Sequence, residues 1–496
     1  MRETTKIQKA WIKKNILERL PKLTVPEAMV LFLALGFYLF WASRITFDYT
    51  IISAPDERLR FMLPDFIFRY NRLPTGYDPE AIYRMGNWSY AFYPQWLGPI
   101  LSAFFMNVAS LIRSGPFVLV FAARLTSVLA GVTTVFFVNR TLRILTKNEK
   151  ISLLGMALVA FWPQFAFLSS YVNNDIIPVA GISIMCYAVA VSLQDKWTLK
   201  SSLTLGIGKV ICLLSYLNSA GFVLAFGLYF LVSNAIDIRK KQIEWKEFRK
   251  CFMAVFLVVA ILWFPFLIRN AVLYEGDILG IASFNRAMVE WEQNESMAWA
   301  YENARIWSYF HDEPWDEGTV LRWVETWTHF QYRDGYLTAG NPYEGTLFDL
   351  LRNRLWVETT VKSFITTIFF AYTRSLPRYI YVPYLLLMLT PLLGLLRIGR
   401  LKAKEMTFFA TCIFGAGVTV GIFLYYNLYT DMQSQGRYLI TILVPLVIGA
   451  TLGMNVFLEK LPEGLKKLIV YSGVIGSAGM LLIILRAFMR LCVITF

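Results

Sequence analysis

The sequence has little of the chemistry that builds metal centres or disulfide frameworks. Among its 496 residues are two histidines and five cysteines, and the cysteines are scattered through mostly apolar runs. Without a C-x-x-C pair, neither a disulfide framework nor a cysteine-based metal site is expected. The two histidines, His311 and His329, are too few for a histidine-built metal centre.

Charged residues are also scarce, at 17% of the chain, whereas 56% of the residues are hydrophobic and 16% are aromatic. This balance excludes an ordinary soluble protein and predicts an all-α polytopic membrane protein. The formal net charge is +14, but the lysines cluster between hydrophobic runs, and the segment 272–360 contains none. Cationic cytoplasmic loops account for the excess, so the charge gives no indication of nucleic-acid binding.

Apolar runs long enough to cross a bilayer predict about eleven transmembrane helices. Their alternation with lysine clusters places the N-terminus in the cytoplasm and residues 44–115 outside. We expect a membrane module over 1–271, an extracytoplasmic region with interfacial helices over 272–379, and a second membrane module over 380–496. The first run is interpreted as a retained anchor, because no signal-peptide cleavage pattern follows it. The runs are 27–43, 116–138, 151–171, 176–194, 201–216, 219–234, 251–271, 380–397, 405–427, 438–456 and 467–485.

One further apolar stretch, 94–112, would place the later lysine clusters outside if it crossed. It is therefore interpreted as a juxtamembrane or re-entrant helix. The segment 59–72 has apolar residues at helical spacing and predicts an amphipathic helix on the membrane surface. Residues 361–371 are expected to lie at the interface as well.

Asp56 and Glu57 follow the first span directly. Acidic groups beside a bilayer are costly unless they are solvated, paired or used. These two could serve as N-terminal acids of the amphipathic helix, favoured by its dipole. Alternatively, they act on a substrate that is itself held at the membrane surface, such as a lipid-linked molecule.

A second acid, Asp175, lies in the short outer loop between the runs 151–171 and 176–194. In the sequence Asn173-Asn174-Asp175 it could cap the following span. The alternative is that Asp175 and Asp56 together hold a divalent cation, Mg²⁺ or Mn²⁺, through carboxylate oxygens.

Cations at the outer ends of the later spans are candidates for binding a phosphate. Arg437 can fork onto phosphate oxygens, and Gly436 would let the backbone approach closely. Arg437 and Tyr438 could equally be an interfacial anchor pair, and Arg269 allows the same two interpretations. Lys209 and Lys362 break the lysine pattern. They either extend to the membrane surface, or one of them binds a phosphate.

With these residues in place, the sequence resembles the GT-C membrane glycosyltransferases, among them the protein O-mannosyltransferases and the lipid A aminoarabinose transferase. The resemblance rests on an Asp-Glu pair opening the first outer loop, two juxtamembrane helices after it, and an acid in the next outer loop. It also rests on the runs Gln435-Gly436-Arg437-Tyr438 and Arg269-Asn270.

The resemblance implies a GT-C-like bundle and an inverting transfer of sugar from a polyprenyl-phosphate carrier to an extracytoplasmic acceptor. The acceptor would be a cell-surface polysaccharide, a teichoic-acid-like polymer or a glycolipid. Asp56 and Glu57 would be catalytic, and Asp175 would shape the site or hold the cation. The residues that bind the donor phosphate would be Arg437, Tyr438, Arg269 and Lys362. A transporter or flippase of a lipid-linked or anionic solute, and a polysaccharide polymerase, are the alternatives.

Overall fold

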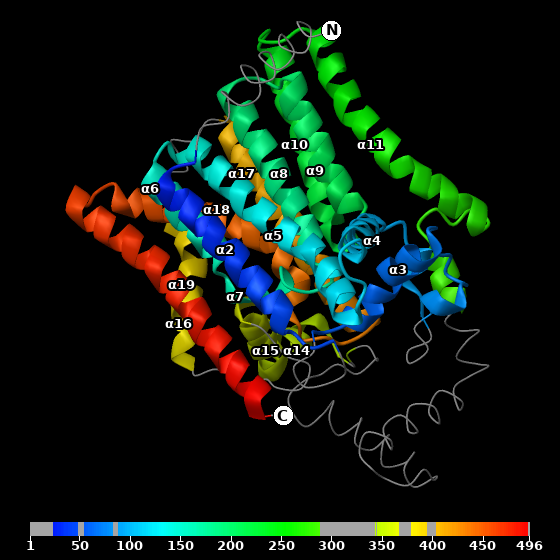
Figure 1. Cartoon of the computed structure of the whole chain (residues 1–496). Helices are drawn as coiled ribbons and strands as arrows, with labels where there is room; N and C mark the ends of the chain where they lie inside the picture. The colour runs from blue at the N-terminus through cyan, green and yellow to red at the C-terminus, as the bar shows by residue number, and fades with distance from the viewer. Residues whose placement is uncertain are drawn as a thin grey trace, which may run out of the picture.

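The computed structural model describes residues 23–47, 54–82, 88–287, 343, 345–366, 378–393 and 403–494. The described residues form helices joined by short turns, and none of them forms a β-strand (Figure 1). The predicted all-α class is therefore confirmed. The predicted division into a first membrane module, an extracytoplasmic region and a second membrane module, with boundaries after residues 271 and 379, stays a prediction.

Within the described ranges, eight helices are long and apolar enough to cross a membrane. Two of these spans begin with a 3₁₀ helix. One consists of η7 (Gly436–Ile442) followed by α18 (Leu443–Leu458), and the other of η4 (Leu217–Ser219) followed by α10. The other spanning helices are α2 (Val25–Arg44), α5 (Pro116–Thr146), α8 (Ile176–Gln194), α10 (Ala220–Arg239), α11 (Trp245–Leu273), α17 (Ala403–Tyr429) and α19 (Glu463–Ile494).

The remaining helices are shorter, and several lie at one end of the bundle. They are α3 (Glu57–Tyr70), α4 (Leu97–Ser110), α6 (Glu149–Ala160), α7 (Pro163–Leu168), α9 (Leu199–Leu213), α14 (Leu347–Arg352), α15 (Arg354–Ile365) and α16 (Val382–Leu389). The 3₁₀ turns η2 (Pro79–Ala81), η3 (Tyr90–Phe92) and η5 (Arg378–Ile380) complete the set.

The count of eleven spans is not confirmed, because three predicted runs form shorter helices. The run 151–171 is divided between α6 and α7, and α7 starts at Pro163, which has no N–H to continue the preceding helix. The run 201–216 forms α9, whose 15 residues extend only about 22 Å, less than the hydrocarbon thickness. The described part of the run 380–397 forms α16, which has only 8 residues. The stretch 94–112, which is not counted among the predicted spans, forms the short helix α4, as expected.

The core lies where α8 packs against α5 and α9, while α10 packs against α17. α8 is buried over most of its surface, whereas α11 exposes most of its apolar side chains. A Cβ on Gly208 of α9 would lie 2.8 Å from the carbonyl oxygen of Gly181 of α8. Glycine at this position therefore allows the two backbones to approach closely.

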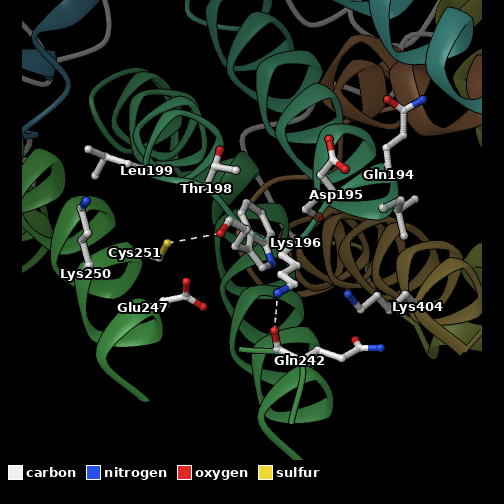
Figure 2. A pocket seen from close by; sticks show the side chains of 13 residues that line it. Gln194, Asp195, Lys196, Thr198, Leu199, Gln242, Glu247, Lys250, Cys251 and Lys404 are labelled. Atoms are coloured by element: carbon white, nitrogen blue, oxygen red, sulfur yellow. Dashed lines mark hydrogen bonds between the residues drawn. The ribbon is translucent and has the colours of Figure 1, made fainter. Parts of the chain in front are cut away.

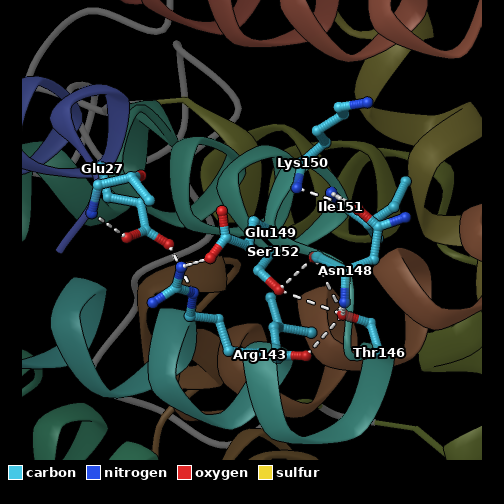
Figure 3. Close-up of polar contacts among 10 residues, drawn as sticks. Glu27, Arg143, Thr146, Asn148, Glu149, Lys150, Ile151 and Ser152 are labelled. Carbon is cyan, nitrogen blue, oxygen red and sulfur yellow. Dashed lines mark hydrogen bonds and ion pairs between the residues drawn. The ribbon is translucent and has the colours of Figure 1, made fainter. Parts of the chain in front are cut away.

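The ends of the long helices define two ends of the bundle. The end that carries α3, α4, α14 and α15, toward the lower right of the bundle in Figure 1, is called the site end below. The opposite end holds the start of α2 and the last turn of α5. There the Oε2 atom of Glu27 accepts a hydrogen bond from the Thr24 N–H at 2.8 Å, and Arg143 pairs with Glu27 at 3.1 Å and with Glu149 (Figure 3). These acids cap and connect helix ends.

Candidate active site

α3 begins at Asp56, whose backbone is in the left-handed region with φ 58°. Aspartate tolerates this conformation better than most residues, but it is uncommon outside glycine. The Asp56 side chain accepts no capping hydrogen bond from α3. The interpretation of Asp56 as a simple helix cap therefore finds no support in the hydrogen bonds of this helix.

The Asp56 carboxylate instead pairs with Arg437, which is 381 residues away in the chain. The Nη2 atom of Arg437 lies 2.5 Å from Oδ2 of Asp56 and also donates to the Tyr438 hydroxyl at 3.0 Å. The Arg437 side chain is 7% exposed and that of Asp56 is 34% exposed. The structure thus brings together three residues that the sequence placed in the site, and leaves the acid open to solvent.

Gly436 positions Arg437 through α15. The Gly436 N–H donates to the Ser363 hydroxyl at 2.6 Å, and a Cβ on Gly436 would lie 2.2 Å from the Thr360 carbonyl oxygen. The close approach expected from this glycine therefore occurs against α15.

Glu57 faces away from Asp56 into the protein, where it pairs with Arg124 of α5. The Nε and Nη2 atoms of Arg124 donate to the two carboxylate oxygens at 2.7 and 2.6 Å, and the Val172 N–H donates to Oε1 at 2.9 Å. The Nη1 atom of Arg124 donates to the carbonyl oxygens of Ala42 and Ile45. Both side chains are buried, so this pair connects α3 to α2, α5 and the loop before α8.

Asp175 lies at the start of α8, but the side chain that caps this helix is that of Asn173. The side chain of Asn173 accepts hydrogen bonds from the N–H groups of Asp175 and Ile176, both at 3.0 Å. The Asp175 side chain makes no capping hydrogen bond. Its buried carboxylate is left in the electrostatic field of Asp56 and Arg437.

Arg60 is the residue that the sequence interpretation missed. It lies one turn after Asp56, and its guanidinium carbon lies 3.5 Å from the centre of the Tyr90 ring. Arg60 also interacts electrostatically with Asp56 and Asp175. Its four-residue spacing from Asp56, which puts both on one face of a helix, is the signal that could have found it.

The two acids of this cluster differ in pKa. Burial raises the pKa of Asp56, but attraction to Arg437 and Arg60 and the hydrogen bond from Arg437 outweigh it, so the net pKa is lowered. Burial also raises the pKa of Asp175, and here Arg437 and Arg60 oppose the change only in part. Asp56 is therefore the acid that is more readily ionised.

Two other predicted phosphate ligands have different contacts. Arg269 donates to the Pro74 carbonyl oxygen at 2.6 Å and lies over the Trp96 ring, so it fixes the turn after α3. Lys362 pairs with Glu358 at 2.6 Å within α15. The structure records no contact of either residue with Asp56 or Asp175 among the described residues.

A divalent cation finds few ligands here. The described residues contain no group of three or more His, Cys, Asp or Glu side chains able to hold a metal ion. The predicted pair of Asp56 and Asp175 offers two carboxylates, one of which is already bound by Arg437. In the described part of the chain, these residues do not fit a cation site by themselves.

A cavity of about 680 Å³ lies at the opposite end of α8, where α8 and α9 connect (Figure 2). Lys196 of this lining donates to the Gln242 carbonyl oxygen, and the Cys251 thiol lies 3.5 Å from the Trp197 carbonyl oxygen. α8 is about 28 Å long. The cavity is therefore separate from the cluster around Asp56.

Comparisons with known proteins agree with the fold. Residues 98–268 match the family described as dolichyl-phosphate-mannose-protein mannosyltransferase. The oligosaccharyltransferase of Archaeoglobus fulgidus, solved in complex with Zn and sulfate, is similar in structure with a TM-score of 0.52 at 12% sequence identity. That match covers 92% of this chain and 52% of the oligosaccharyltransferase. This chain thus spans about half the length of that enzyme.

ArnT from Cupriavidus metallidurans, solved in the apo state, matches with a TM-score of 0.46 at 12% identity, covering 89% of this chain and 61% of ArnT. The sequence has no significant match among curated proteins. The resemblance to the GT-C membrane glycosyltransferases and the helical, multi-span fold that it implied are confirmed.

Proposed function

We propose that this chain is an inverting glycosyltransferase that moves a sugar from a polyprenyl-phosphate carrier to an acceptor at the extracytoplasmic face of the cell membrane. The observation that carries the proposal is the partly exposed Asp56–Arg437 pair at the start of an amphipathic helix, with Asp175 and Arg60 in the same electrostatic cluster. The mannosyltransferase match over 98–268 and the oligosaccharyltransferase-like fold support it.

In the proposed step, the oxygen of an acceptor hydroxyl attacks the anomeric carbon from the face opposite the phosphate. The new C–O bond forms as the bond from the anomeric carbon to the phosphate oxygen breaks. The phosphate takes that electron pair and leaves as polyprenyl phosphate, while Asp56 accepts the hydroxyl proton. The configuration at the anomeric carbon is inverted.

The Asp56–Arg437 pair suits this step in two ways. Arg437 holds the carboxylate in one orientation and keeps it ionised. When Asp56 takes the proton, the pair weakens, and the positive charge of Arg437 is no longer balanced. A nearby cation stabilises the negative charge that develops on the leaving phosphate.

Glu57, which the sequence also placed in the catalytic pair, is proposed to act through position. Both of its oxygens are occupied by Arg124, and the pair is buried. Holding the first turn of α3 against α5 fixes the backbone of Asp56 next to it. Rigid support of this kind is what a reacting carboxylate needs.

The transporter alternative depended on unpaired charge within the membrane, at Arg124 and Lys209. Arg124 is neutralised by Glu57, which removes part of that support. Among the acceptors, a cell-surface polysaccharide, a teichoic-acid-like polymer and a glycolipid all remain compatible with a hydroxyl nucleophile.

The test is to incubate the purified protein in detergent with radiolabelled polyprenyl-phosphate sugar and a membrane-derived acceptor fraction. We expect the donor to be consumed and polyprenyl phosphate to be released. Asp56→Asn should lower the rate by about 100-fold or more, the range for loss of a catalytic base. Asp65→Asn, which removes a carboxylate from a surface pair on the same helix, is the matched control. Movement of the donor across sealed vesicles without its consumption in detergent would instead establish a transporter.

A further inference from the structure

Arg60 is a cation of the site that forms no ion pair with any acid among the described residues. We propose that it binds the phosphate of the lipid-linked donor, the role that the sequence assigned to Arg437, Arg269 and Lys362. The inference rests on the proposed function and deepens it, because it names the group that recognises the carrier.

The geometry of α3 places Arg60 beside the reacting carboxylate. The Arg60 N–H donates to the Asp56 carbonyl oxygen at 2.9 Å, so the two residues are one turn apart and share a helix face. The Asp56 carboxylate turns to Arg437. None of the carboxylates in the described residues forms an ion pair with Arg60.

Tyr90 holds the Arg60 guanidinium by stacking and does not occupy the N–H donors of that group. The separation of 3.5 Å between the guanidinium carbon and the ring centre indicates stacking on the ring face. A stacked guanidinium keeps its N–H groups directed outward in its own plane. Tyr90 itself lies in the turn η3, where the Ser89 hydroxyl accepts from the Ala91 N–H at 3.3 Å. A fork of donors is thus presented on a fixed surface.

The other candidate cations are already engaged. Arg437 is paired with Asp56, Arg269 donates to the backbone at Pro74, and Lys362 is paired with Glu358. An anion approaching any of these residues must compete with the existing contact. At Arg60 it has no ion pair with a described residue to break, and the two non-bridging oxygens of the donor's phosphodiester can accept two parallel hydrogen bonds from one guanidinium.

The charges of the cluster fit an anionic ligand at this position. Asp56 and Arg437 neutralise one another, and Asp175 is the other acid whose charge acts on Arg60. Asp175 is buried and its ionised form is disfavoured there, so it compensates Arg60 only weakly. A phosphate at Arg60 completes this balance, and it lies one helical turn from Asp56.

Binding is measured with three probes on the protein in detergent: a polyprenyl phosphate, the matching polyprenol and inorganic phosphate. The wild type should bind the polyprenyl phosphate more tightly than the polyprenol. Arg60→Met should weaken binding of the polyprenyl phosphate by roughly 10- to 100-fold, as expected for loss of charged hydrogen bonds, and leave the polyprenol unchanged. Arg60→Lys should fall between, because it keeps the charge and loses the planar fork.

Arg69→Met is the matched control, because Arg69 is an exposed residue of the same helix and pairs with Asp65. It should bind all three probes as the wild type does. Inorganic phosphate should bind far more weakly than polyprenyl phosphate and displace it only at high concentration if the lipid carrier is the ligand. An equal loss for phosphate and alcohol in Arg60→Met would show a structural role and overturn the proposal, as would no loss at all.

The binding test is separate from the test of sugar transfer. If polyprenyl phosphate binds in an Arg60-dependent way but no labelled sugar is transferred, the inference stands and the transferase proposal fails. If sugar is transferred and Arg60→Met binds the carrier normally, the transferase proposal stands and the inference fails.

Discussion

Asp56 and Glu57 are neighbours in the sequence, and each pairs with an arginine, but the two pairs lie in different surroundings. Glu57 accepts three hydrogen bonds, and its partner Arg124 also donates to two backbone carbonyls, with both side chains buried. Asp56 is partly exposed and bound by one atom of Arg437, whose Nε atom has no hydrogen-bond partner in the part of the chain that the structure describes.

This difference distinguishes an acid that stabilises the start of α3 from an acid that is available to a substrate. Consecutive helical residues point about 100° apart, so one acid can enter the protein while the next faces the solvent. A fully satisfied buried pair resists any further ligand, whereas a partly satisfied one retains donors and acceptors for a substrate. The catalytic role is therefore assigned to Asp56, and the supporting role to Glu57.

The largest effect on stability is expected from breaking the buried pair. Glu57→Gln leaves the Arg124 guanidinium buried without a counter-charge, which should cost about 3–5 kcal/mol. Thermal unfolding in detergent measures this loss, and Asp56→Asn in parallel should unfold within a few degrees of the wild type. The double variant Glu57→Met with Arg124→Met should recover part of the loss. A stable but inactive Glu57→Gln protein would place Glu57 in the chemistry and remove the distinction.

A smaller effect on stability is expected from a substitution that displaces Arg437, the partner of Asp56. Gly436→Ala introduces a Cβ at 2.2 Å from the Thr360 carbonyl oxygen, so η7 must shift away from α15. Overpacking of this kind costs about 1–3 kcal/mol, and we expect sugar transfer to fall more than stability because Arg437 follows the shift. Gly417→Ala on α17 has open space around its new Cβ and is the control. Normal transfer by Gly436→Ala would show that the position of Arg437 is not critical.

Much of the fold was predictable from the sequence, because hydropathy reports which segments can lie in a membrane. Apolar length alone could not show that Pro163 divides the run 151–171 or that α9 is short. The pairs of Asp56 with Arg437 and Glu57 with Arg124 depend on helix packing over 381 and 67 residues of chain. Local patterns carry no information on such contacts.

Two features of the site were visible in local spacing. Arg60 follows Asp56 by four residues, and Lys362 follows Glu358 by four residues, which is the spacing of neighbours on a helix surface. The first spacing places an additional cation at the site. The second shows that one of the predicted phosphate ligands already has a partner.

The two acids of the cluster should respond to pH with opposite signs. The pKa of Asp56 is lowered in the folded protein, so its ionised form stabilises the fold above the ordinary carboxyl range and loses that effect as the pH falls. The pKa of Asp175 is raised, so its ionised form destabilises the fold at neutral pH and the protonated form does not.

Asp56→Asn should therefore lower the melting temperature slightly at pH 8, and Asp175→Asn should raise it. The difference for Asp175→Asn should shrink as the pH falls from 8 toward the ordinary carboxyl pKa of 3.8. The difference for Asp56→Asn should persist down to that pH and shrink only below it. Melting curves of the two variants and the wild type across this range measure the effect. The same sign for both variants would show that their surroundings do not differ in the way proposed.

The smallest effect is expected for Lys362→Met. Lys362 lies on the site end, but its charge is compensated by Glu358 within one helix, and such a pair contributes about 0.3–0.5 kcal/mol. Sugar transfer and binding of polyprenyl phosphate should stay close to those of the wild type, measured beside Arg60→Met in the same assays. Both variants remove one cation from this end of the bundle, and they differ in whether that cation already has an acidic partner. A loss of carrier binding in Lys362→Met as large as that in Arg60→Met would show that pairing does not decide which cation meets the phosphate, and the assignment to Arg60 would lose its main argument.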